Sequence, residues 1–289
     1  MMGPRLQEYA ISLGFSLSHI NQSIYITKEN QTLIINSLYS PKIKKILKNF
    51  DYYFSAVDGF NFMGNETINF SSISQHKLKN YDVFQPYYPS IADPYEDLCK
   101  QNQNLNCQDG ENVLDVGAYA GISSVYFSKK IGKNGKIISI EPNTNNFECL
   151  NKNIEIYKSI SSLNNISVIK AAIWSESGFI DFACDRNLGL SPIKIVGNKY
   201  FKSKVQAFTL SQISSEYNLK SVDKIKINSS ISKAEILSDG DFFQTFKPTI
   251  LTEIKSNEKY LFNVLEKYGY KHSPVHELKI DLPLYIFSI

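Results

Sequence analysis

From residue 112 to the C-terminus, short apolar runs alternate with segments in which apolar residues recur at helical spacing. The short runs predict strands at residues 113–115, 135–141, 166–170, 223–227, 249–254 and 284–288. The helical spacing predicts helices at residues 122–131, 146–158 and 257–267. Strands that alternate with helices are typical of βαβ units, so we expect an α/β fold with a mostly parallel sheet.

The first 92 residues show a different pattern. They predict a short helix at 5–13, a hairpin of strands 23–27 and 32–36, and a helix opened by Pro41. Residues 50–95 are crowded with Phe and Tyr, which we interpret mainly as packing residues, although a few of them could line a sugar site. We therefore predict an N-terminal region, residues 1–92, with a role in acceptor binding or assembly, and a main domain, residues 93–289.

An excursion interrupts the main domain between its third and fourth predicted strands. Residues 178–184 and 204–208 predict two further strands, and residues 185–200 form the segment between them. This segment fits a substrate lid and a plain long connection equally well. Just after the excursion, the sequence from Thr209 to Gln212 matches a capping box that opens a helix.

The stretch from Asn112 to Gly121, NVLDVGAYAG, gives the first chemical signal. An apolar strand ends on Asp115 and breaks into a turn that contains Gly117, Ala118, Tyr119 and Gly121. Glycines let a backbone turn sharply and approach a ligand, and the helix that follows offers free N–H groups at its start. The stretch therefore predicts a ligand-binding strand–turn–helix unit.

A second acid supports this interpretation. Glu141 ends the next strand, about 20 residues beyond the glycine turn, where βαβ nucleotide sites place an acid against ribose hydroxyls. A dinucleotide and S-adenosylmethionine (SAM) both fit an acid in this place. Tyr119 stands where the dinucleotide fingerprint needs its middle glycine, and a carboxylate at Asp115 would repel a pyrophosphate but suit an ammonium group. The charges favour SAM.

Several motifs, in order from about residue 90 onward, resemble those of the FkbM-like SAM-dependent methyltransferases. They are DVGAYAG at 115–121, IEPN at 140–143 with Asn146, VDKIKIN at 222–228 and KPTILTEI at 247–254. The resemblance implies a Rossmann-like class I methyltransferase sheet with an antiparallel C-terminal strand. It also implies that the cofactor is SAM, and that Pro142, Asn143 and the end of the third strand at Ala172 contribute to its site, Ala172 through backbone or packing.

The chain departs from this family after the fourth strand. The family usually reads Ile-Asp-Val-Glu-Gly-Ala-Glu there, whereas this chain reads INSSISKAE from Ile227 to Glu235. The usual carboxylate has become Asn228, which can hold a hydroxyl but cannot take its proton at neutral pH. Glu253, at the end of the fifth strand, is the remaining candidate base, and His272 is a weaker one.

Composition narrows the function further. The 31 basic and 28 acidic residues leave a net charge of +3, which is too balanced to indicate nucleic-acid binding. The four cysteines are scattered without metal-ligand spacing, so we predict no metal site. We find no signal pattern and no apolar run long enough for a membrane helix, and therefore expect a cytoplasmic protein without an integral membrane segment.

Two functions follow from these observations. The first is an O-methyltransferase, for which the resemblance implies a hydroxyl acceptor such as a sugar of a surface glycan or a related small molecule. The second is a SAM-binding but catalytically degenerate protein that acts as a partner or regulator, because Asn228 replaces an acid. A nicotinamide-dependent dehydrogenase is a distant third, which Tyr119 disfavours.

Overall fold

The structure of the chain is a computed structural model that describes residues 4–79, 81–89, 102–184, 201–228, 233–275 and 283–289. The chain divides into two compact units, the first made of Met1–Glu96 and the second of most of the remaining residues. The predicted boundary between residues 92 and 93 falls outside the described residues, so its position stays a prediction.

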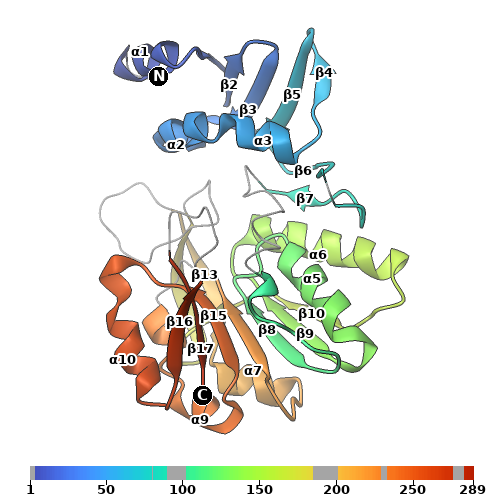
Figure 1. Cartoon of the computed structure of the whole chain (residues 1–289), viewed down its shortest axis with the longest axis vertical. Helices are drawn as coiled ribbons and strands as arrows, with labels where there is room; N and C mark the ends of the chain where they lie inside the picture. The colour runs from blue at the N-terminus through green and yellow to red at the C-terminus, as the bar shows by residue number, and fades with distance from the viewer. Residues whose placement is uncertain (1–3, 80, 90–101, 185–200, 229–232, 276–282) are drawn as a thin grey trace. The chain divides into compact units, whose positions relative to one another are not determined.

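The first unit is built on a five-stranded sheet with the order β1-β2-β3-β5-β4 (Figure 1). Its strands are β1 Ser16–Ile20, β2 Ser23–Lys28, β3 Gln31–Asn36, β4 Phe60–Phe62 and β5 Asn65–Phe70. The predicted hairpin is β2 and β3, and β3 also pairs in parallel with β5. A small two-stranded sheet, β6 Ser74–Gln75 and β7 Tyr87–Tyr88, follows.

Short helices accompany this sheet. They are α1 Pro4–Ser12, the 3-10 helix η1 Ser37–Lys42, α2 Ile43–Lys48 and α3 Phe50–Ala56. The helix that Pro41 was predicted to open begins earlier as η1, because the side chain of Asn36 accepts a hydrogen bond from the Leu38 N–H and caps it. Many of the aromatic residues pack as expected, for example Phe50 edge-on against Phe15 at 5.0 Å between ring centroids.

The second unit contains a seven-stranded sheet in the order β10-β9-β8-β14-β15-β17-β16. The strands are β8 Asn112–Val116, β9 Lys136–Ile140, β10 Ile166–Ile169, β14 Lys224–Ile227, β15 Thr249–Glu253, β16 Lys271–Val275 and β17 Leu284–Ser288. The first five run parallel, and β17 lies antiparallel between β15 and β16. The predicted Rossmann-like sheet with an antiparallel C-terminal strand is confirmed.

Helices flank this sheet. They are α5 Ile122–Ile131, the 3-10 helix η2 Gly132–Asn134, α6 Thr144–Ile160, α7 Leu210–Glu216, α8 Lys233–Ile236, α9 Gly240–Phe246, the 3-10 helix η3 Ser256–Glu258 and α10 Tyr260–Glu266. Successive residues of a strand face opposite sides. Accordingly, Leu114 belongs to the core cluster that includes Leu210 and Ile213 of α7, while the next residue, Asp115, meets Ser124 of α5.

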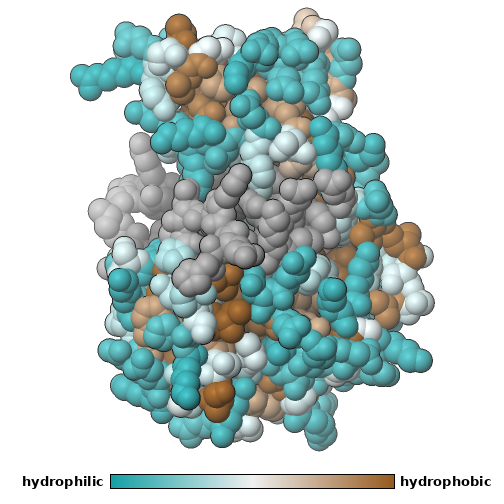
Figure 2. Space-filling view, in the orientation of Figure 1, coloured by the Kyte–Doolittle hydropathy of each residue, from teal (hydrophilic) through white to brown (hydrophobic). Residues whose placement is uncertain are grey.

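The excursion forms a three-stranded sheet of its own, in the order β11-β13-β12. Its strands are β11 Ala172–Ile173, β12 Gly178–Cys184 and β13 Phe201–Phe208, and the predicted lid segment at 185–200 lies outside the described residues. In Figure 2, hydrophilic residues predominate over much of the visible described surface. None of the helices in the described part of the chain has the length and apolar character that crossing a membrane requires.

Candidate functional site

The turn between β8 and α5 has the backbone conformation that its glycines predict. Gly117, Tyr119 and Gly121 have positive φ angles of 77°, 54° and 84°. A Cβ atom on Gly121 would lie 2.6 Å from Cδ1 of Leu150 in α6, so any larger residue would require the Leu150 side chain to shift. A positive φ is costly for tyrosine, so Tyr119 marks a strained position in the turn. The turn is therefore held in one shape and packed closely on α6.

The same turn is hydrogen-bonded to the end of β9. The N–H groups of Gly117 and Ala118 donate to the carbonyl oxygen of Ile140 at 2.9 and 3.1 Å. The N–H of Tyr119 donates to Oε2 of Glu141 at 3.0 Å. The predicted turn and the predicted second acid, which lie 22 positions apart in the sequence, therefore meet.

Glu141 is 5% exposed and is surrounded by donors. Besides Tyr119, the N–H of Asn143 and the side-chain Nδ2 of Asn146 donate to its Oε1 at 2.9 and 3.2 Å. Burial raises the pKa of the Glu141 carboxyl to about 7, although the hydrogen bonds from Asn143, Tyr119 and Asn146 oppose this rise. Glu141 is thus a carboxyl group that titrates near neutral pH inside the predicted site.

The surroundings of Glu141 fit the ribose of a nucleoside ligand. A carboxylate offers about four acceptor positions, and three donors already use Glu141. One hydroxyl can therefore bind directly, and a second would replace an existing donor. The side-chain Oδ1 of Asn143 caps α6 by accepting hydrogen bonds from the N–H groups of Asn145 and Asn146.

Asp115 lies at the end of β8, but its carboxylate faces protein groups. It is fully buried; Ser124 Oγ donates to its Oδ2 at 2.7 Å, and Lys226 Nζ lies 3.3 Å from its Oδ1. Its predicted contact with a ligand ammonium group stays a prediction. In this structure the cation beside the Asp115 carboxylate is the amino group of Lys226.

Ala172 lies just beyond the third parallel strand, as expected. It is buried, pairs with Ala207 of β13 and packs with Val205 in a small apolar cluster. A contact of Ala172 with the cofactor, through its backbone or by packing, stays a prediction.

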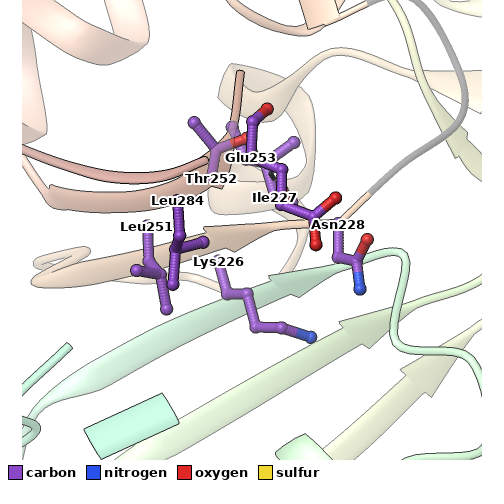
Figure 3. Close-up of a pocket in the computed structure, with 7 residues that line it drawn as sticks. All are labelled: Lys226, Ile227, Asn228, Leu251, Thr252, Glu253 and Leu284. Atoms are coloured by element: carbon purple, nitrogen blue, oxygen red, sulfur yellow. Dashed lines mark hydrogen bonds between the residues drawn. The ribbon is translucent and has the colours of Figure 1, made fainter. Parts of the chain in front are cut away.

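Asn228 and Glu253 stand at the ends of the adjacent strands β14 and β15. Both line a small pocket, together with Lys226, Ile227, Leu251, Thr252 and Leu284. In Figure 3 the Glu253 carboxylate points toward Asn228. Asn228 is exposed and Glu253 is half-buried, so both can be reached from solvent. The two predicted catalytic residues are therefore brought together.

His272, the weaker candidate base, does not line this pocket. Its ring stacks on Phe262 at 4.3 Å between centroids and lies near Tyr285 and Phe287. It belongs to an aromatic cluster on the antiparallel side of the sheet. In the described ranges, no group of three His, Cys, Asp or Glu side chains could hold a metal ion.

Sequence reasoning missed Lys226, which is 5% exposed and pairs with Asp115. A signal was present, because a lysine between Ile225 and Ile227 in a buried strand requires a partner inside the protein. The partner could not be read from the sequence, since Asp115 lies 111 positions away.

Comparison with known proteins gives one family. The model of the Methyltransferase FkbM domain matches residues 115–275, which include the glycine turn, Glu141, Asn228 and Glu253. A comparison with curated proteins found no match.

Three solved structures illustrate the structural likeness. A methyltransferase FkbM from Methylobacillus flagellatus KT has a TM-score of 0.49 and 16% identity over 62% of this chain and 44% of its own. A precorrin-6y C5,15-methyltransferase from Geobacter metallireducens GS-15 has a TM-score of 0.44 and 16% identity, over 68% of this chain and 89% of its own. Aeropyrum pernix fibrillarin, with natively bound SAM, has a TM-score of 0.43 and 12% identity, over 95% of this chain and 98% of its own. The chain thus spans less than half the length of the first of these proteins.

Proposed function

Because the chain belongs to the FkbM methyltransferase family, we propose that it methylates a hydroxyl group of a sugar in a surface glycan or of a related small molecule. The family is one of methyltransferases, and the cofactor is SAM. The hydroxyl and the sugar are the proposed part. The hydroxyl is supported by the pair Asn228 and Glu253, which offers a hydroxyl-binding amide and a carboxylate base in one pocket. The sugar rests on the resemblance to the FkbM-like family alone.

The strand order supports this assignment of roles. Ligands in such sheets bind at the carboxyl ends of the strands, at the point where the strand order reverses, which here lies between β8 and β14. Along that edge Glu141, the glycine turn, Asn228 and Glu253 follow one another, because they end or follow β9, β8, β14 and β15. Glu141 would hold the ribose of SAM, the glycine turn would hold its amino-acid end, and Asn228 would face the acceptor.

The chain's own groups then have distinct tasks. When bound, SAM supplies a methyl group activated by a positively charged sulfur. Asn228 holds the acceptor hydroxyl, and alignment of reacting groups is a large part of the rate enhancement. Glu253 takes up the hydroxyl proton, a contribution typically worth about 10²–10⁴-fold.

The test is methyl transfer from labelled SAM to a panel of mono- and oligosaccharides, followed by mass spectrometry of the products. We expect a methyl ether, and we expect Glu253→Gln to abolish it while the affinity for SAM is unchanged. Glu266→Gln, an exposed glutamate of α10, is the matched control and should be fully active. Full activity of Glu253→Gln would remove Glu253 as the base.

The replacement of the family's acid by Asn228 favours a second candidate, a SAM-binding protein without catalysis that acts as a partner or regulator. This candidate predicts that the purified protein binds SAM but transfers no methyl group to any acceptor in the panel. It also predicts that Glu253→Gln changes neither the affinity for SAM nor the absence of methyl transfer.

We assign the N-terminal region, predicted as residues 1–92, to acceptor binding or assembly. A chain that starts near Ser90 should then keep its affinity for SAM and lose acceptor methylation. Insolubility of the shortened chain would show instead that the aromatic residues of the N-terminal region are core shared with the rest of the protein.

A further inference from the structure

Lys226 is a buried cation in the middle of the sheet. It lies between Ile225 and Ile227 on β14, and its register partner on the neighbouring parallel strand β8 is Asp115. The side chains are 5% and 0% exposed, and Nζ lies 3.3 Å from Oδ1 of Asp115. In Figure 3 the Lys226 side chain extends away from Thr252 and Glu253.

This ion pair is the centre of a polar network. Lys226 Nζ also donates to Ser123 Oγ at 3.0 Å, and Asn102 Nδ2 donates to the same oxygen at 3.2 Å. On the other side of Asp115, Ser139 Oγ on β9 donates to Ser124 Oγ at 2.8 Å. The network therefore joins β8, β9 and β14 to the first turn of α5.

Stability alone does not explain such a network. The cost of removing two charges from water offsets most of their attraction, so a buried ion pair is weak evidence for stability. What the pair does provide is fixed geometry, because both carboxylate oxygens of Asp115 are held from defined directions. The fixed elements are the end of β8 and the start of α5, which flank the glycine turn.

The position of the pair connects it to one part of the donor. It lies between β8 and β14, on the far side of β8 from Glu141. Glu141 keeps two donors from its own β9–α6 connection, Asn143 and Asn146, so the adenosine end has independent support. The turn that the pair supports is the part of the site that would hold the amino-acid end of SAM.

We propose that Lys226 is a positioning residue for the amino-acid end of SAM. By pairing with Asp115 and Ser123, it fixes the glycine turn relative to β14, and thereby relative to Asn228. Asp115 acts on the turn through this pair, and the turn's backbone meets the ammonium and carboxylate of the donor. This inference rests on SAM binding at the turn and does not depend on the nature of the acceptor.

The experiment compares two ligands in calorimetry, SAM and 5′-methylthioadenosine, which keeps the adenosine and lacks the amino acid. The variant is Asp115→Asn with Lys226→Met, which removes both charges together and avoids leaving one buried charge unpaired. We expect its affinity for SAM to fall about tenfold, which is roughly the change in affinity that the loss of one hydrogen bond causes. Its affinity for 5′-methylthioadenosine should stay within about twofold of the native value.

A matched control lies on the same strand. Lys224 pairs with Glu111 at 3.5 Å, with side chains 14% and 20% exposed, at the amino end of the sheet. Lys224→Met with Glu111→Gln removes a comparable pair far from the turn and should leave both affinities unchanged. Lys226→Arg, which keeps the charge, should retain most of the affinity for SAM.

Two results would overturn the proposal. One is native affinity for SAM in the double variant, and the other is an equal loss for both ligands, which would make the pair a general structural element. If the double variant does not fold, Asp115→Asn with Lys226→Gln, which also leaves no buried charge unpaired, gives the test with the same two ligands. A native protein that binds neither ligand would instead contradict the cofactor assignment.

Discussion

The proposed donor half of the site, at the ends of β8 and β9, differs from the proposed acceptor half, at the ends of β14 and β15. In the donor half Asp115 and Glu141 are 0% and 5% exposed, and each is fixed by neighbouring donors. In the acceptor half Asn228 is exposed and Glu253 is half-buried. The difference fits the proposed roles, because a fixed, buried half suits one constant ligand and an accessible half suits a substrate that must enter and leave.

The largest effect is expected from Glu141→Ala in the donor half. Hydrogen bonds to a charged group contribute about 1.5–3 kcal/mol, so loss of one ribose contact should weaken SAM binding about tenfold or more. Calorimetry measures this change, and circular dichroism should show an unchanged fold. Glu148→Ala, an exposed glutamate on α6, is the control. Equal SAM affinity in Glu141→Ala and Glu148→Ala would disprove the ribose role.

A smaller effect, on stability, is expected from Gly121→Ala. A positive φ costs an alanine roughly 1–2 kcal/mol, and its Cβ would also meet Leu150 at 2.6 Å. Gly110→Ala separates the two causes, because Gly110 has a similar φ of 83° and no atom within 4 Å of its Cβ position. In urea unfolding, Gly121→Ala should lose more free energy of unfolding than Gly110→Ala. Equal losses would show that the Leu150 side chain moves aside at no cost.

The pH dependence of the donor half follows from Glu141, whose pKa is raised to about 7. Hydroxyl donors bind the ionised carboxylate, so SAM affinity should rise as the pH increases and approach a plateau above about pH 7. The unfolded carboxyl has its ordinary lower pKa, so the free energy of unfolding of the ligand-free protein should fall from about pH 4.5 to about pH 7. Glu141→Gln should remove both trends; calorimetry and thermal unfolding across this range test them.

Much of the donor half could be predicted from sequence because its signals are local. The glycine turn, the helix at 122–131 and the acid at Glu141 all lie within one βαβ unit, and the structure places them as predicted. Each depends on a short motif whose backbone requirements are specific to glycine or to a strand end.

What the sequence did not reveal depends on contacts between distant segments. The Lys226–Asp115 pair requires knowledge that β14 lies beside β8, and no local pattern contains that register. The parallel pairing of β3 with β5 and the strand β1 were missed for the same reason, since neighbours are chosen by the packed fold. In the acceptor half, Ser229 to Ser232 lie outside the described residues, so the effect of the altered loop stays a prediction.

The smallest effect is expected from Asn228→Asp in the acceptor half. Asparagine and aspartate have nearly the same size, so the pocket shape should be retained while a carboxylate is added. If Glu253 accepts the hydroxyl proton, a second carboxylate at position 228 is not needed, and the rate should change only a few-fold, far less than the 10²–10⁴-fold typical of a missing base. The measurement is kcat with a productive acceptor, alongside SAM affinity.

The same substitution also separates the two candidate functions when it is combined with Glu253→Gln. In an active enzyme, Asn228→Asp with Glu253→Gln tests whether a carboxylate on β14 can replace the one on β15, and partial recovery would show that the pocket accepts a base from either strand. In a degenerate protein, native activity is negligible, and Asn228→Asp alone would be expected to create methyl transfer where none existed. A large gain from Asn228→Asp in the native background would therefore contradict the assignment of Glu253 as the working base.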